Sequence, residues 1–257
     1  MKTQTSQPFA RKLFCLFFIA FSLVVSAQDT TANNASVSAT SNKSFSKSRV
    51  FVGSQIPVQL TAGYGYQFSN RLAIQSYAGL ITKPYGGFIV NAMEAFGMDK
   101  YLAQVIKKSF KSGTVLGLGP NYLFGKNYFG IYGQYMHLKG GGVTPADALS
   151  VYFKKDFTQF DVAGPPLFEF SLQSNLMNVG ALFGRSFQLR NPRISINGEI
   201  SLSKIVASKN SFASNRSFVD QTAYAKNLYK ELDSEMRDAY RKHGFIPTIN
   251  VYLAYRL

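Results

Sequence analysis

Residues 175–202 read NLMNVGALFGRSFQLRNPRISINGEISL, and this stretch decides the fold. Met177 and Val179 alternate with Asn178 and Gly180, so apolar side chains fall on one face of a strand and small or polar ones on the other. After a turn at 190–192 the same alternation resumes. The stretch therefore predicts two long antiparallel strands, each with one apolar and one polar face.

The same alternation with period two recurs along most of the chain. Many of these segments exceed the strand length of about 5–6 residues that is usual in soluble proteins, and they match the roughly 9–11 residues of a tilted membrane-spanning strand. Gln, Asn, Ser and Gly on the second face would be costly to bury between two dry sheets. A barrel with a polar, hydrated interior and an apolar outside removes that conflict. The segments are 58–68, 71–80, 114–124, 128–138, 175–189, 193–202 and 248–257.

Short and long connections alternate, as they do when one end of a barrel has turns and the other has loops. If both termini lie at the short-turn end, the strand number must be even, so one more strand is expected at 45–52, followed by a short outer loop at 53–57. We predict an all-β, antiparallel up-and-down transmembrane barrel of eight strands over residues 45–257, or of ten if a long loop contains a hairpin. The short connections are 69–70, 125–127 and 190–192, and the long ones are 82–112, 139–173 and 207–244.

The N-terminus has the layout of a secretory signal peptide. A basic segment ending at Lys12 precedes an apolar run at 13–25, which is short for a membrane-spanning helix. Small residues ending at Ala27 then suit a signal peptidase, so we expect export through the secretory pathway with cleavage after Ala27. Residues 28–44 are polar and without periodicity, and they are predicted to be a disordered linker.

Composition narrows the classes of function. The chain has 23 Phe and 15 Tyr, and such aromatic content argues against a largely disordered protein. One Cys and two His make a disulfide framework or a multi-ligand metal site improbable, and no cofactor is expected. The formal charge of +15 comes without any nucleic-acid-binding motif, so it points to an anionic membrane surface before nucleic acid.

The end of the chain carries a more specific resemblance. Alternating apolar residues there look like the terminal strand of bacterial outer-membrane barrels, which the barrel-assembly machinery recognises. Together with the signal peptide and the strand layout, residues from about 45 onward are similar to small OmpA-type outer-membrane β-barrel proteins. The chain departs from that pattern by ending on Leu257 where Phe is usual, and by lacking a periplasmic peptidoglycan-binding domain. A secreted soluble barrel such as a lipocalin is the alternative. The alternating residues are Ile249, Val251, Leu253, Tyr255 and Leu257.

The long loops contain helical patterns. Residues 99–110 repeat apolar side chains at helical spacing, and Thr144-Pro145-Ala146-Asp147 is a capping box that predicts a helix at about 145–153. A third helix is expected at about 218–243, capped by 217–220 and ending at Gly244. Its apolar stripe is expected to pack as a cap over the barrel rim, with a partner-binding groove as the alternative. The stripe consists of Tyr224, Leu228, Leu232 and Met236.

A group of lysines in the first long loop has few acidic neighbours. It is expected to contact lipopolysaccharide phosphates or another anionic ligand at the cell surface, although a run of charge is more often a solvated face. The lysines are Lys100, Lys107, Lys108 and Lys111.

Neither histidine lies in a recognisable catalytic constellation. Some small outer-membrane barrels modify lipid A, and that chemistry needs a nucleophile or activated water beside a positioned base. His137 has no serine two residues further on, and His243 stands near the end of a loop.

We therefore predict a non-enzymatic outer-membrane barrel whose helical surface loops have a structural or interaction role, with outer-membrane lipid, lipopolysaccharide and a surface protein as candidate partners. A narrow passive pore, suggested by inward glycines, is the second hypothesis, and a lipid A-modifying enzyme is the third. The inward glycines are Gly63, Gly65, Gly117, Gly119, Gly180 and Gly184.

Overall fold

The computed structural model describes residues 47–56, 58–157, 169–216 and 220–257. The expected signal peptide and linker lie outside these ranges. Within them, no helix is long and apolar enough to cross a membrane.

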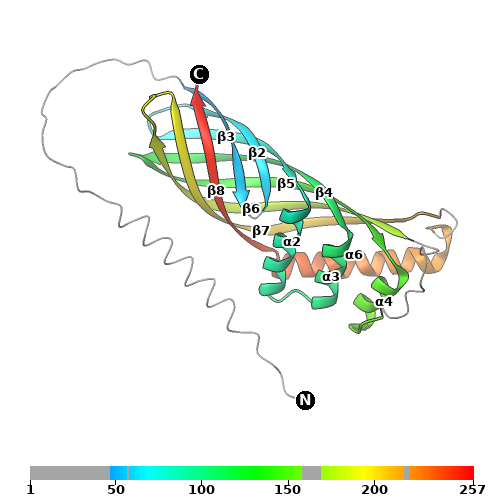
Figure 1. Ribbon diagram of the computed structural model, residues 1–257. Helices are drawn as coiled ribbons and strands as arrows, with labels where there is room; N and C mark the ends of the chain where they lie inside the picture. Colours follow the sequence, from blue (N-terminus) through cyan, green and yellow to red (C-terminus); the bar gives the residue numbers. More distant parts are fainter. Residues whose placement is uncertain (1–46, 57, 158–168, 217–219) are drawn as a thin grey trace, which may run out of the picture. The chain divides into compact units, whose positions relative to one another are not determined.

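Eight antiparallel strands form one closed barrel in sequence order, and β1 pairs with β8 to complete the ring (Figure 1). The predicted eight strands and up-and-down topology are therefore confirmed. Closure leaves no open sheet edge, so the backbone donors and acceptors of the ring are paired between strands. The strands are β1 (Ser48–Ile56), β2 (Gln59–Gln67), β3 (Leu72–Ile81), β4 (Phe110–Phe124), β5 (Asn127–Val143), β6 (Phe170–Gln188), β7 (Ile194–Ser214) and β8 (Phe245–Arg256).

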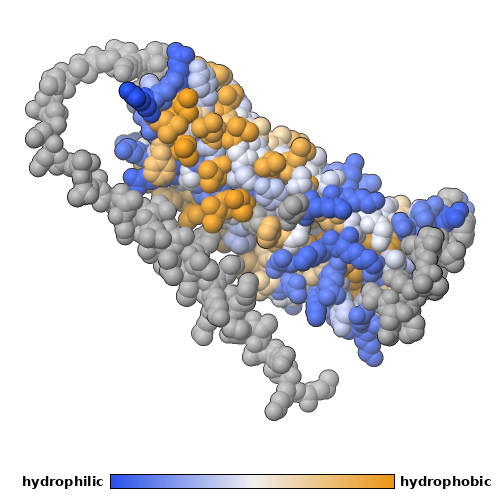
Figure 2. Space-filling model, viewed as in Figure 1, coloured by the Kyte–Doolittle hydropathy of each residue, from blue (hydrophilic) through white to orange (hydrophobic). Residues whose placement is uncertain are grey.

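The outside of the barrel is apolar over most of its length, and the inside is polar. Leu118 on β4, Ile131 on β5 and Val179 on β6 point outward and are exposed, whereas Asn178 and Glu199 are buried inside. Figure 2 shows hydrophobic residues gathered over the barrel wall and hydrophilic residues over the helical end. A soluble protein of this size rarely exposes so large an apolar surface.

Towards the helical end the wall reverses its polarity. On β5, Tyr135 is the last aromatic residue outside and Gln134 the last polar residue inside, and beyond them His137 faces outward while Met136 faces inward. On β4 and β6, Val115 and Leu176 likewise face inward while Thr114 and Asn175 face outward. Val58, which directly precedes β2, and one apolar side chain on each strand from β3 to β8 belong to the same buried cluster and are at most 2% exposed. We call these seven residues the inversion ring. Its members are Val58, Ile81, Val115, Met136, Leu176, Ile205 and Ile246.

Several strand boundaries differ from the sequence prediction. Strand β1 continues to Ile56, through the residues assigned to a loop, because its pairing with β2 and β8 runs on to the turn. Strands β6 and β7 are 19 and 21 residues long and pair up to Phe170 and Ser214. The alternation of apolar-out and polar-in that defines the predicted strands ends at the inversion ring, although the hydrogen-bonded ladder continues past it.

The described part of the chain has four helices, and they lie at the end of the barrel away from the C-terminus (Figure 1). They are α2 (Lys83–Ala95), α3 (Lys100–Ser109), α4 (Pro145–Phe153) and α6 (Ala223–His243). The capping box of α4 is present as predicted, with the Thr144 side chain accepting from the Asp147 backbone. Thr222 caps α6, rather than the 217–220 segment, of which 217–219 lie outside the described residues. The sequence pattern does not predict α2, because this helix contains Pro84, Gly86 and Gly87, which are poor helix formers.

Candidate functional site

Buried polar and aromatic side chains line the interior of the barrel between the turn end and the inversion ring. Near the middle, the buried Glu199 carboxylate accepts a hydrogen bond from the Tyr128 hydroxyl at 2.7 Å and another from the Asn250 amide at 2.9 Å. Tyr132 donates to Ser201 at 3.2 Å on the same side of the lumen. These bonds join β5, β7 and β8 across the interior and hold a buried acidic group among polar partners.

The inward glycines are sockets for aromatic rings. Tyr77 on β3 is the register partner of Gly117 on β4, and its ring occupies the space that a Cβ atom of residue 117 would need. Tyr128 covers Gly184 in the same way. Five of the six glycines that suggested a water path therefore admit a large side chain, and the sixth, Gly119, lies close to the backbone of Ile131 and Tyr132. The other directly paired examples are Phe51 with Gly63, Tyr132 with Gly180, Tyr252 with Gly53 and, with a charged side chain, Arg49 with Gly65.

A layer of amides separates this network from the helical end. The Gln59 amide donates to Gln55 at 2.6 Å, and longer contacts of 3.4 Å connect Gln134 to Gln55 and Asn178 to Gln134. All four side chains are buried. Some buried side-chain amide oxygens, including those of Gln59 and Asn178, have no partner among the described residues, which suits an interior that holds ordered water.

The inversion ring and the helices share one apolar core. Met93 of α2, Leu102 and Ile106 of α3, and Met236 and Tyr240 of α6 belong to the same buried cluster as the ring. The helices thus continue the hydrophobic packing across the barrel mouth. Only the C-terminal portion of the predicted stripe of α6 packs into this core, through Leu232 and Met236. Tyr224, at the start of the stripe, is 75% exposed and lies outside the core.

Two aspartates fasten α6 to strand β7. Asp233 accepts from the backbone and side-chain nitrogens of Asn210, both at 3.0 Å, and pairs with Arg237. Burial acts to raise the pKa of Asp233, but the hydrogen bonds from Arg237 and Asn210 outweigh it and hold the pKa below its ordinary value. Just before α6 begins, Asp220 accepts from the Tyr229 hydroxyl of α6 at 2.7 Å and from the backbone of Ser214 on β7 at 2.9 Å.

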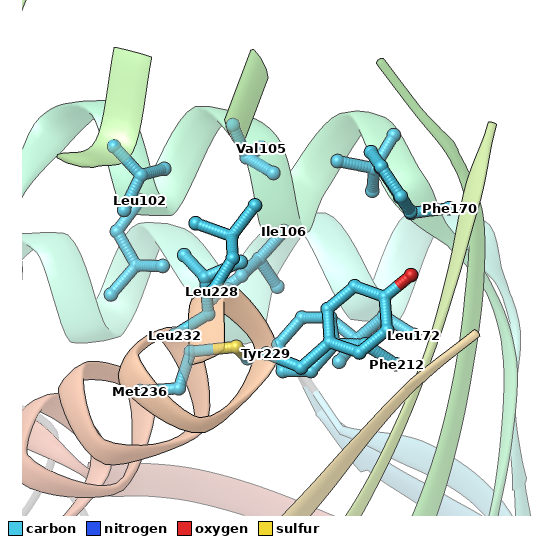
Figure 3. Close-up of a pocket in the computed structure, with 12 residues that line it drawn as sticks. Leu102, Val105, Ile106, Phe170, Leu172, Phe212, Leu228, Tyr229, Leu232 and Met236 are labelled. Carbon is cyan, nitrogen blue, oxygen red and sulfur yellow. The ribbon is translucent and has the colours of Figure 1, made fainter. Parts of the chain in front are cut away.

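A small cavity lies between α3, α6 and the extended ends of β6 and β7 (Figure 3). Its volume is about 30 Å³, room for a single water molecule, and apolar side chains line it. Leu228, Leu232 and Met236 of α6 face Leu102 and Ile106 of α3 across it (Figure 3). A space of this size between the helices is a packing gap rather than a ligand pocket.

The four lysines predicted to form an anionic contact have different surroundings. Lys108 pairs with the buried Asp147 at 2.9 Å, and Lys107 donates to Asn91 at 3.2 Å. Lys100 is exposed, and the ammonium group of Lys111 lies beside Gly141 on β5. The contact with an anionic ligand remains a prediction, and Lys111 emerges as the member that reaches the outer face of the barrel wall.

Each histidine ring contacts an amide or carbonyl oxygen. His137 Nδ1 lies 2.6 Å from Asn175 Oδ1, which also accepts from Tyr135, and His243 Nδ1 lies 2.7 Å from the Phe96 carbonyl oxygen. Among the described residues, no serine or threonine donates a hydrogen bond to either ring, and no group of His, Cys, Asp and Glu could hold a metal ion. The structure offers no positive evidence for catalysis.

The C-terminal residues that resemble an assembly signal all point away from the lumen. Ile249, Val251, Leu253 and Tyr255 are exposed on the outer face of β8, and Leu257 follows the end of the strand. Their recognition by an assembly machinery remains a prediction.

No family model and no curated protein matches this chain. Among solved structures, it is similar to the CarO2 protein of Acinetobacter baumannii, with 11% identity, a TM-score of 0.38, and coverage of 82% of this chain and 97% of that one. It is also similar to a major outer membrane protein of Thermus thermophilus, with 12% identity, a TM-score of 0.41, and coverage of 82% and 98%. Both TM-scores are below 0.5, so these similarities carry no argument about function.

Proposed function

We propose that this chain is a non-enzymatic barrel of the bacterial outer membrane, exported with cleavage after Ala27, whose helical loops face the cell exterior and close the barrel mouth. The observation that carries the proposal is the reversal of wall polarity at the inversion ring. Between the turn end and the ring, the wall is apolar outside and polar inside, as a membrane-spanning barrel requires. Between the ring and the helices, the outer face is polar and the inner face carries apolar residues, as in a soluble protein.

The contents of the lumen support a structural or surface-interaction role over transport. Paired aromatic rings occupy the glycine positions, a hydrogen-bonded layer of amides follows, and the shared apolar core of the ring and helices lies across the mouth. A narrow pore would need a continuous polar path past that core. Conductance across a planar bilayer tests this point: the purified barrel should show no steady single-channel current, and regular unitary currents would favour the pore.

Membrane insertion is tested by gel migration. A closed barrel with all its strands paired should resist sodium dodecyl sulfate until heated, so boiled and unboiled samples should migrate differently. Identical migration, with the protein in the soluble periplasmic fraction, would contradict the proposal.

Orientation is tested by cysteine labelling on intact cells. Ser211 lies in the extension of β7 towards the helices, and Asn70 in the turn at the opposite end of the barrel. A cysteine at position 211 should react with an impermeant maleimide, and one at position 70 should not. The reverse pattern would show that the helices face the periplasm.

A further inference from the structure

Strands β4 to β7 extend well beyond the length needed to cross a membrane. They have 15, 17, 19 and 21 residues, whereas β1, β2 and β3 have 9, 9 and 10. A tilted strand crosses the hydrocarbon core in about 9–11 residues. One side of the barrel wall therefore continues past the inversion ring, and its outer face there lies where lipid headgroups would be.

The outer face of this extension changes from apolar to polar within one step of the strand register. Leu116, Tyr135, Met177 and Ala207 are paired across β4 to β7 and form the last apolar row. The next outward row consists of Thr114, His137, Asn175 and Lys209, and the one after it of Ser112, Lys139, Gln173 and Ser211. None of these eight polar residues is acidic.

Three lysines give this surface its charge. Lys139 and Lys209 are exposed in the two polar rows, and the ammonium group of Lys111 lies beside Gly141, two residues beyond Lys139. In the described part of the chain, none of the three makes an ion pair or a side-chain hydrogen bond. Lys204 lies nearer the turn end of β7 and makes a cation–π contact, with its ammonium group 5.0 Å from the centre of the Phe245 ring.

We propose that Lys111, Lys139 and Lys209 form a binding site for the phosphate of an anionic membrane lipid, whose acyl chains lie along the apolar row below. We call it the wall site. Headgroups occupy roughly 5–8 Å of each leaflet, and a strand rises about 3.3 Å per residue, so the two polar rows match the depth of the phosphates. The side chains of Asn175 and Gln173 stand between Lys139 and Lys209 and add polar groups at the same depth. The inference rests on the proposed function, because it requires the apolar wall to lie in a membrane.

The absence of tryptophan from the chain permits a site-specific test. A single reporter introduced as Met177→Trp lies in the last apolar row beneath the wall site, and one introduced as Val52→Trp lies on β1, on the short-stranded side. The side chains of both residues are about equally exposed, at 54% and 57%. Each variant is reconstituted into vesicles that contain brominated phosphatidylglycerol or brominated phosphatidylcholine, and quenching of the reporter gives the relative affinity for the two lipids.

At Met177→Trp, we expect phosphatidylglycerol to bind at least about fivefold more tightly than phosphatidylcholine, the factor that one lysine near an anionic surface contributes. At Val52→Trp the ratio should be near one. Replacing Lys111, Lys139 and Lys209 by Gln should bring the ratio at the first reporter to that of the second. The matched control replaces three exposed lysines of α6 by Gln, with the same change of charge, and should leave the ratio unchanged. The control lysines are Lys226, Lys230 and Lys242.

The two proposals fail in different ways. Equal lipid ratios at both reporters, or a ratio that survives loss of the three wall lysines, would overturn the wall site while leaving the membrane barrel intact. If neither brominated lipid quenches either reporter, the wall is not in contact with lipid, and the proposed function itself is wrong.

Discussion

Replacing Gly117 by Ala tests whether the inward glycines are sockets. The added methyl group would collide with the ring of Tyr77, the register partner of Gly117. The ring has little room to move away, because Tyr77 packs against the buried pair of Phe51 and Tyr252 on one side and against the main apolar core on the other. Overpacking of this kind costs about 1–3 kcal/mol.

The matched control is Gly133→Ala on β5. This glycine points out of the barrel, and nothing lies within 4 Å of an added Cβ atom. Its replacement should change stability little, or raise it by about 0.4–1 kcal/mol by restricting the unfolded chain. The two variants should therefore differ by about 2 kcal/mol, which is roughly a thirtyfold difference in the unfolding equilibrium.

The measurement is a urea titration of each variant folded in vesicles, with the folded fraction read from the migration of unheated samples on a gel. Gly117→Ala should unfold at a clearly lower urea concentration than Gly133→Ala. Adding Tyr77→Leu should recover part of the loss in Gly117→Ala, because the smaller side chain leaves room for the methyl group, whereas Tyr77→Leu alone should destabilise the barrel by opening a cavity. Equal midpoints for the two glycine variants would refute the socket explanation and reopen the question of a water path.

Three further changes test the interior and the helical layer. Glu199→Ala should lower stability by about 1–3 kcal/mol because the Tyr128 hydroxyl loses its acceptor, whereas Glu199→Gln keeps an acceptor oxygen and should cost less; equal losses would contradict this assignment. Replacing Leu228 and Leu232 by Asp should increase protease nicking of α6 without impairing barrel assembly, since the strands carry their own hydrogen bonds; unchanged nicking together with loss of a co-purifying protein would favour the partner groove. The pKa of Asp233 is lowered in the folded protein, so its contacts stabilise α6 fully above the unfolded pKa of about 3.9 and are lost as the pH falls through the lower folded value. Nicking should therefore rise between about pH 5 and strongly acidic pH, and Asp233→Asn, which does not titrate, should show no such change over the same range.

The number of strands and the direction of their side chains followed from the sequence because the membrane imposes a simple rule on both faces of the wall. In such a barrel, outward residues such as Leu118 on β4 and Val179 on β6 face lipid. The residues that alternate with them along each strand face a polar lumen. That rule ends at the inversion ring. At Leu172 and Gln173 the inner residue is the apolar one and the outer residue is polar, so the expected pattern is reversed. The sequence therefore predicts that β6 begins at 175 rather than at Phe170, and that β7 ends at 202 rather than at Ser214.

The role of the glycines could not be predicted without the register between strands. In sequence, Tyr77 and Gly117 are 40 residues apart, and only the pairing of β3 with β4 brings the ring over the glycine. The candidate lysines show the same limitation. Lys108 and Lys111 are neighbours in the chain, yet one pairs with Asp147 of α4 and the other reaches the outer wall beside β5. Lys108 and Lys111 are close in the sequence, but in the folded protein their ammonium groups have different surroundings.

The reversal of wall polarity also explains why the mouth is covered by helices. Beyond the inversion ring the wall has a polar outer face, and its apolar inner residues, such as Met136 and Leu176, would be exposed to water if the mouth were open. The helices remove that surface from solvent, since Met93 of α2, Ile106 of α3 and Met236 of α6 pack into the same core. An open channel would need polar side chains on the inversion ring. The residues that end the membrane-spanning part of the wall are thus the same residues that require a cap.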